Sequence, residues 1–275
     1  MGVEINGATL HYSVAGENNA QPLIVLHGGR GIGDHTADFN AFRPLADRFR
    51  LIGYDQRGCG CSSMTPPFTF EQLTDDVEGV RRTLGQNKAM ILIGGSFGGM
   101  IALCYAIRYP DRVSHLILRG TAPSHHHEEA ALRNATARLS KATSASLEMV
   151  RKIFSGAEDD LELRLIWLAL QPLYFERFDP DAALARTRAM HFHSETHRAL
   201  FQNKEAYDLR GRLKEIKART MVIVGERDWI CPPDQSRIIA EGVPGARLLI
   251  VEGANHAVHI ERNAQVIEAI RAFLP

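Results

Sequence analysis

The pattern with the clearest chemical meaning is a serine among glycines, GGSFGG at residues 94–99. It follows an apolar run typical of a buried strand and precedes a helical pattern. Small neighbours allow a tight strand-to-helix turn that leaves a serine hydroxyl exposed, as a nucleophile requires. A glycine-rich phosphate loop would need a lysine and a different spacing. The pattern therefore predicts Ser96 as the nucleophile of an acyl transfer.

A serine nucleophile needs a base, and the base needs an acid that fixes its tautomer. The apolar runs TMVIVGE (220–226) and ARLLIVEG (246–253) are followed by loops that supply Asp228 and His256. The order Ser, Asp, His accompanies this kind of serine turn. An aspartate alone is more often a turn or cap residue, so the assignment of Asp228 depends on that order. His259 is the rival base; because His256 lies nearer the strand end, we expect His259 to serve in packing or support.

Backbone amides that could stabilise an oxyanion are predicted at two places. One is the amide of Phe97, directly after the nucleophile. The other lies in HGGRG at residues 27–31, and we assign it to Gly29; the alternative there is an ordinary glycine-rich turn. A loop after another predicted strand carries Asp55 and Arg57, which we expect to brace that loop by hydrogen bonds without entering the chemistry.

The elements that must position these residues alternate between short apolar runs and helix-length segments. Residues 3–14 alternate around Asn6-Gly7, a hairpin signal. The later apolar runs lie at 22–29, 50–55, 89–95, 113–120, 220–226 and 246–253, and helical segments include 70–84 and 97–108. This order predicts an α/β fold, with a mostly parallel sheet covered by helices on both faces and an antiparallel entry.

One long segment breaks the alternation. Residues 124–213 are rich in helix formers and contain no convincing strand. We interpret them as an inserted helical cap on a core formed by residues 1–123 and 214–275; the alternative is a helical subdomain without contact to the site. The run His125-His126-His127 could bind a metal, but a solvated loop is the better interpretation.

The composition limits the classes of partner that this protein is expected to bind. The chain has 275 residues, with 32 basic and 32 acidic side chains and a formal net charge of zero. This balance argues against nucleic acid or an anionic membrane as partner, and favours a small molecule. The four cysteines match neither a zinc site nor a disulfide scaffold, and neither a secretory signal nor a membrane span is found. We expect a cytoplasmic protein that uses no metal or organic cofactor; its oligomeric state stays open.

The motifs together resemble the proline iminopeptidase group of α/β-hydrolases. The matching strings are HGGRG at 27–31, YDQRGCGCS at 54–62, GGSFGG at 94–99, YPDRVSHLILRG at 109–120, GERDWICPP at 225–233 and ANH at 254–256. The resemblance implies the same triad and oxyanion amides, and release of N-terminal proline from short peptides. That family usually has proline after the double glycine and tryptophan after the nucleophile, where this chain has Arg30 and Phe97.

Substrate contacts are harder to assign. Such aminopeptidases bind the substrate amine with acidic residues, and candidates in the cap are Glu176, Glu195 and Glu205; Arg30 and Trp229 are further candidate contacts. The leading function is an aminopeptidase that releases a small residue such as proline. The alternatives are an esterase or lactonase on a small acyl substrate and a non-catalytic ligand-binding protein, against which an intact triad argues. Perhydrolysis, transacylation and carbon–carbon bond hydrolysis also remain open.

Overall fold

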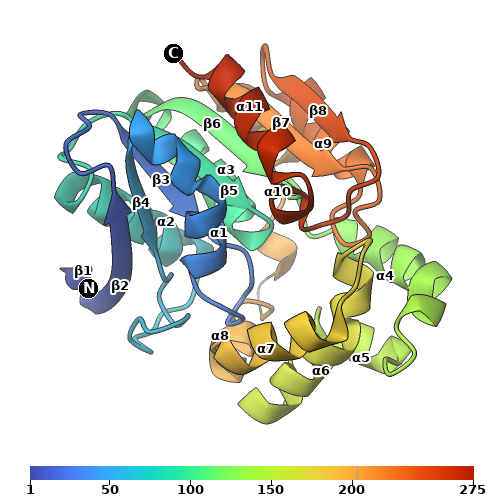
Figure 1. Cartoon of the computed structure of the whole chain (residues 1–275). Coiled ribbons are helices and arrows are strands. Elements are labelled where there is room, and N and C mark those ends of the chain that lie inside the picture. Colours follow the sequence, from blue (N-terminus) through green and yellow to red (C-terminus); the bar gives the residue numbers. More distant parts are fainter. Residues whose placement is uncertain (203) are drawn as a thin grey trace.

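The computed structural model describes residues 1–202 and 204–275. A single eight-stranded sheet runs through it in the order β1-β2-β4-β3-β5-β6-β7-β8 (Figure 1). The strands are β1 (Gly2–Ile5), β2 (Ala8–Ala15), β3 (Pro22–Leu26), β4 (Arg50–Tyr54), β5 (Met90–Gly95), β6 (Val113–Arg119), β7 (Arg219–Gly225) and β8 (Arg247–Val251).

The sheet begins antiparallel and continues parallel. β1 and β2 form a hairpin around Asn6 and Gly7, whose φ angles are 48° and 76°. β2 pairs antiparallel with β4, and the pairings from β4 through β3, β5, β6 and β7 to β8 are parallel. The predictions of an N-terminal hairpin and of a mostly parallel sheet are confirmed.

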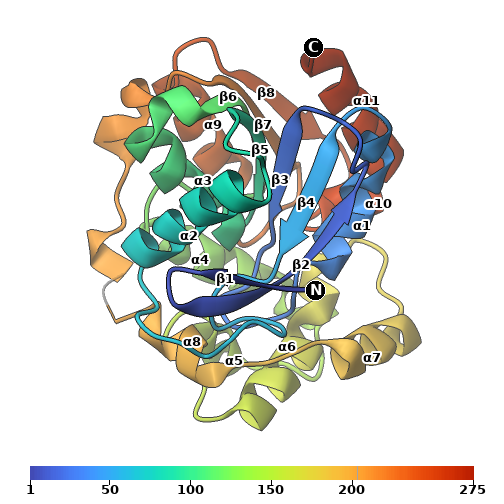
Figure 2. The ribbon, with the colours of Figure 1, turned by 90° about the vertical axis from the view of Figure 1, so that its left-hand side faces the viewer.

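Helices cover both faces of this sheet. In β3, Ile24 and Leu26 pack into the cluster that contains α2, α3 and α9, whereas Leu23 and Val25 pack into the cluster with α1 and α11. This is the alternation that a strand buried on both faces imposes. Figure 2 shows α2 and α3 on one side of the sheet and α1 and α11 on the other. These helices are α1 (Thr36–Phe42), α2 (Phe70–Thr83), α3 (Phe97–Arg108), α9 (Pro233–Gly242), α10 (Val258–Glu261) and α11 (Asn263–Phe273).

The segment between β6 and β7 adds no strand to the sheet in its described part, residues 120–202 and 204–218. Its helices lie to one side of the core, below the sheet in Figure 1. They are α4 (His127–Arg138), α5 (Leu147–Lys152), α6 (Asp160–Tyr174), α7 (Pro180–Ala189) and α8 (Ser194–Ala199). A bridge joins Phe192 to Ile32 in the loop after β3, so these helices lie over the carboxyl edge of the sheet.

Short 3₁₀ turns connect several elements, at Arg43–Asp47, Pro110–Arg112, Leu139–Lys141, Lys204–Ala206 and Arg210–Glu215. Among the described residues, no helix combines the length and the apolar character that crossing a membrane requires. The four cysteines are free thiols.

Candidate active site

Ser96 lies between β5 and α3 in a conformation that residues other than glycine rarely adopt, with φ 51° and ψ −120°. Glycines make this turn possible. A Cβ at Gly98 would lie 2.3 Å from the carbonyl oxygen of Leu26, and a Cβ at Gly28 would lie 3.1 Å from Cβ of Ser96. The tight strand-to-helix turn expected at residues 94–99 is therefore present, with a half-buried serine at its apex.

Asp228 and His256 face each other in the loops after β7 and β8. Nδ1 of His256 lies 2.8 Å from Oδ2 of Asp228, and both residues are buried. The other carboxylate oxygen, Oδ1, accepts hydrogen bonds from the amides of Ile230 and Cys231 at 3.0 and 2.9 Å. Because a carboxylate only accepts, Nδ1 of His256 carries the hydrogen and Nε2 is left able to take a proton.

His259 occupies a different environment. Its Nε2 lies 3.4 Å from Oδ1 of Asp38, and its ring stacks on Phe42 with centroids 6.0 Å apart. Burial lowers the pKa of His259 to about 3, and the charge of Arg119 adds to this effect. His259 is therefore a neutral packing residue, while the contact with Asp228 belongs to His256.

A buried ion pair between Arg119 and Asp38 supports the His256 loop, and sequence reasoning missed it. Nη2 of Arg119 lies 2.9 Å from Oδ1 of Asp38, and Nη1 donates to the carbonyl of His256 at 3.3 Å. Burial raises the pKa of Asp38, but the charge of Arg119 and its hydrogen bond outweigh this effect, so that the pKa is lowered overall. Nothing in the sequence around Asp38 marks it as the partner of an arginine 81 residues away.

Gly120 is a further residue of the site that the sequence did not reveal. It follows β6 with a φ of 48°, and a Cβ there would lie 2.9 Å from Oδ2 of Asp228 and 3.3 Å from Nδ1 of His256. Any larger residue would press on the Asp228–His256 contact. The signal available was a glycine directly after a buried strand, which by itself is common.

The loop after β3 brings Gly28 against Ser96, and Gly29 lines the same cavity as the serine. Gly29 has a φ of 85°, and a Cβ there would lie 2.1 Å from the carbonyl oxygen of Ile32. The amide of Phe97 is the first of α3, where helical amides have no partner within the helix. Within residues 1–202 and 204–275, neither the Gly29 nor the Phe97 amide donates to a backbone carbonyl.

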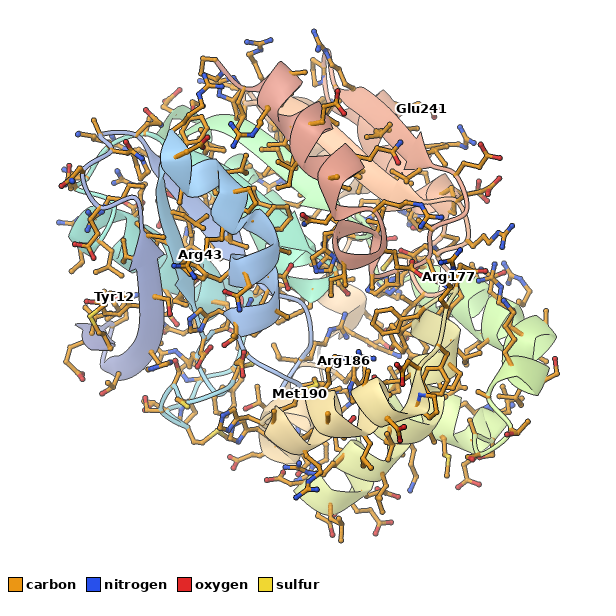
Figure 3. The ribbon with its side chains drawn as sticks, viewed as in Figure 1. Tyr12, Arg43, Arg177, Arg186, Met190 and Glu241 are labelled. Atoms are coloured by element: carbon orange, nitrogen blue, oxygen red, sulfur yellow. The ribbon has the colours of Figure 1, made fainter. Side chains whose placement is uncertain are left out.

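A cavity of about 510 Å³ opens beside Ser96 and His256. The core supplies one wall, and the segment between β6 and β7 supplies the other through residues that include Trp167 and Phe201. Arg186 and Met190 also line it, and Figure 3 shows both at α7 where this helix faces the core. The volume and the mainly apolar wall suit a small molecule.

Arg30 and Trp229, the two further predicted substrate contacts, differ in their position relative to the cavity. Arg30 lines the cavity, with its guanidinium carbon 5.2 Å from the ring centroid of Phe97. Trp229 is fully buried behind the wall, where its ring meets Tyr174 edge-on at 5.2 Å, and it does not line the cavity. Of the pair, only Arg30 can touch a ligand in this structure.

The three predicted cap glutamates do not line the cavity. Glu195 and Glu205 are exposed on the surface. Glu176 follows α6, where its carboxylate accepts from Nδ2 of Asn255 at 3.0 Å and from Arg227 at 2.8 Å. Glu176 thus ties the end of α6 to the loops of Asp228 and His256. The structure gives none of the three a place to receive a substrate amine.

The loop after β4 is braced as expected, with separate partners for its two charged residues. Oδ2 of Asp55 accepts from the amide of Cys61 at 2.8 Å, and Oδ1 from the amide of His35 at 2.9 Å. Arg57 forms a buried bidentate pair with Asp76 at 2.8 and 2.9 Å. Both residues hold the loop, and neither lines the cavity.

The fold is that of the α/β-hydrolases, and comparison with known proteins agrees. The family model described as alpha/beta hydrolase fold matches residues 21–263. The chain belongs to the α/β-hydrolase fold family, as its motifs predicted.

Within this family, the chain is similar to several individual proteins. The chain is 50% identical over 275 residues to the proline iminopeptidase PfmaB of Pestalotiopsis fici. The alignment covers 99% of this chain and 98% of the relative. It is 27% identical to the proline iminopeptidase of Neisseria gonorrhoeae, over 97% of this chain and 93% of that one. Among solved structures it resembles the enol-lactonase of Burkholderia xenovorans LB400, with a TM-score of 0.78 and 29% identity over 99% of both chains. The predicted resemblance to proline iminopeptidases is confirmed.

Proposed function

We propose that this chain is a serine hydrolase that forms an acyl-enzyme on Ser96, with His256 as base and Asp228 as the acid that orients the base. The observation that carries the proposal is the 2.8 Å contact between His256 and Asp228 beside a serine held at φ 51°. A non-catalytic binding protein would need neither the oriented imidazole nor the strained serine.

The reaction follows from these positions. Nε2 of His256 takes the proton of Ser96 Oγ as the oxygen attacks the substrate carbonyl, and then passes it to the leaving group. Water, deprotonated by the same nitrogen, attacks the acyl-enzyme and releases the acid. We assign the oxyanion hole to the amides of Gly29 and Phe97, because neither amide donates to a backbone carbonyl and both residues line the cavity that Ser96 lines.

For the substrate, we propose a small molecule or short peptide, with release of an N-terminal residue such as proline as the leading activity. The support is the 50% identity to a proline iminopeptidase over nearly the full length of both chains. We further propose that residues 124–213 act as a cap on a core of residues 1–123 and 214–275, because described residues of both parts line the cavity. Free thiols favour a reducing compartment, and we place the activity in the cytoplasm.

A second candidate, an esterase or lactonase acting through the same triad, is favoured by the composition of the cavity. The carboxylates among its described lining residues are Asp34 and Asp38, and Asp38 is paired with Arg119. The three cap glutamates lie elsewhere, so the described part of the wall offers only one acid outside an ion pair, Asp34, for a free amine. The similarity to an enol-lactonase fits this candidate.

One assay separates the two candidates. Purified protein is compared on proline β-naphthylamide and on a short-chain p-nitrophenyl ester, with Ser96→Ala as the control. Turnover of the prolyl amide, abolished in Ser96→Ala, is the expected result. Ester turnover without prolyl amide turnover would remove the aminopeptidase proposal, and full activity of Ser96→Ala on either substrate would remove the triad.

A further inference from the structure

Arg30 places a positive charge inside the cavity. Its guanidinium carbon lies 5.2 Å from the ring centroid of Phe97 and 4.4 Å from that of Phe201, and Nη2 donates to the sulfur of Met100 at 3.3 Å. Phe97 and Met100 belong to the first turn of α3, directly after Ser96. The charge therefore lies against the first turn of the helix that follows the nucleophile.

This charge lacks a close carboxylate. Among residues 1–202 and 204–275, no carboxylate oxygen lies within 4.0 Å of the Arg30 guanidinium. Glu128 is the acid that acts on it most strongly, but Oε2 of Glu128 is bound by Lys204 at 2.5 Å. Burial lowers the pKa of Arg30 from its usual value, which is the sign of a cation that is poorly compensated. Arginine nevertheless stays protonated at neutral pH.

The other charges of the cavity do not cancel it. Arg119 and Asp38 neutralise each other at 2.9 Å. Arg186 is exposed and donates to Gln171, and the half-buried carboxylate of Asp34 accepts from the amide of Thr36. Of the three arginines among the described lining residues, Arg30 is thus the one that is neither paired with a carboxylate nor exposed, and a ligand can pair with it.

We propose that the substrate carries a carboxylate and that Arg30 binds it, which makes Arg30 a specificity-determining residue of this site. The inference rests on the proposed hydrolase function and narrows its substrate class. A guanidinium offers two parallel donors that match a carboxylate, and a half-buried position strengthens the contact. The same charge repels an ammonium group. In a peptide, the carboxylate would be the free C-terminus of a dipeptide; in an ester or lactone, it would belong to the acyl part.

Two substrate pairs, each differing only in the carboxylate, test this and distinguish its source. The leaving-group pair is Pro-Gly and Pro-Gly-amide. The acyl pair is the mono-p-nitrophenyl ester of glutaric acid and the same ester of its monoamide. In at least one pair, we expect kcat/KM to be about 10- to 100-fold higher for the carboxylate, the range for a hydrogen-bonded charge pair. Arg30→Gln should bring that ratio close to one, and Arg30→Lys should keep part of it.

Arg177→Gln is the matched control. Arg177 is an exposed residue after α6, labelled in Figure 3, which does not line the cavity. The control removes one arginine charge from the surface of the segment between β6 and β7 and should leave the ratio unchanged. Equal rates for both members of both pairs in the wild type, or an unchanged ratio in Arg30→Gln, would overturn the proposal.

A binding measurement separates this inference from the proposed function. In Ser96→Ala protein, calorimetry with monomethyl glutarate and with its neutral monoamide should show about 10-fold tighter binding of the carboxylate, lost when Arg30→Gln is added. If Ser96→Ala retained turnover and still bound the carboxylate more tightly, the serine mechanism would be rejected and the role of Arg30 would stand. Equal binding of both compounds, together with equal rates for Pro-Gly and Pro-Gly-amide and with turnover abolished in Ser96→Ala, would reject only the role of Arg30.

Discussion

Arg119 and Asp38, which are 81 residues apart, form a buried ion pair at 2.9 Å, and the same guanidinium donates to the carbonyl of His256. The pair joins the end of β6 to α1 and reaches the loop after β8. A cation at this point orders the backbone that presents the imidazole, so the stability of the fold and the position of the base depend on the same contact.

Arg119→Met should destabilise the protein by about 3–5 kcal/mol, since it leaves the charge of Asp38 buried without its partner. Urea unfolding at pH 7 measures the loss. The matched surface change is Arg237→Met, which breaks an exposed pair with Asp234 at 3.9 Å and should cost less than about 1 kcal/mol. Equal unfolding midpoints for the two variants would show that the buried pair contributes no more to stability than the exposed pair does.

Asp228→Asn should keep the fold but lower kcat by about 10⁴-fold. The amide oxygen of asparagine can still accept from the amides of Ile230 and Cys231, whereas its NH₂ group facing His256 would favour the wrong imidazole tautomer. Circular dichroism and steady-state kinetics check both halves. Asp234→Asn, at the exposed start of α9, is the control. A near wild-type kcat in Asp228→Asn would mean that another acid orients the base.

Gly120→Ala should reduce kcat far more than it reduces stability. The new Cβ would lie 2.9 Å from Oδ2 of Asp228, so the carboxylate or the imidazole must move. Gly245→Ala separates contact from backbone strain, because Gly245 has a similar positive φ, 70°, with nothing within 4 Å of its Cβ position. Both variants should lose about 1–2 kcal/mol in unfolding. If both also retain full kcat, Gly120 has no part in holding the pair.

The sequence predicted those features that local spacing encodes. β5 and α3 were recognisable because an apolar run, a glycine-flanked serine and a helical pattern follow one another directly. The Asp228–His256 partnership was predictable for the same reason, since each residue follows its own buried strand and adjacent parallel strands end at one edge. Helix bounds within a residue or so also followed, as at α2 (Phe70–Thr83).

What depends on distant partners was not predictable. Glu176 looked like a candidate for binding an amine, but the structure turns it toward Asn255 and Arg227. Acidic residues are frequent in helical segments, and no local pattern tells which one faces the cavity. Arg30 was only a candidate contact in the sequence; its chemical meaning depends on Phe201 and on the engagement of Glu128 by Lys204, both far along the chain.

Buried neutral histidines should make the protein less stable as the pH falls from about 6.5 toward 4. Burial lowers the pKa values of His127 and His197 to about 4 and that of His259 to about 3. Between these values and an unfolded pKa of about 6.5, the unfolded chain binds protons that the folded chain refuses, so unfolding becomes easier with each step down. Above pH 6.5 the contribution is fully present. Below it, each histidine adds a slope of up to about 1.4 kcal/mol per pH unit.

His197→Asn tests the contribution of one of these histidines. Nδ1 of His197 donates to the carbonyl of Arg30 at 2.7 Å, and the side-chain NH₂ of asparagine can replace this donor without titrating. Urea unfolding at several pH values between 5 and 7 gives the free energy of unfolding as a function of pH. For the variant this free energy should fall less steeply with decreasing pH, by about the slope that corresponds to one proton. His126→Asn, at an exposed position, should leave the wild-type slope intact. If the free energy of unfolding changed with pH in parallel for wild type and His197→Asn, His197 would be protonated in the folded protein. Burial would then not lower its pKa.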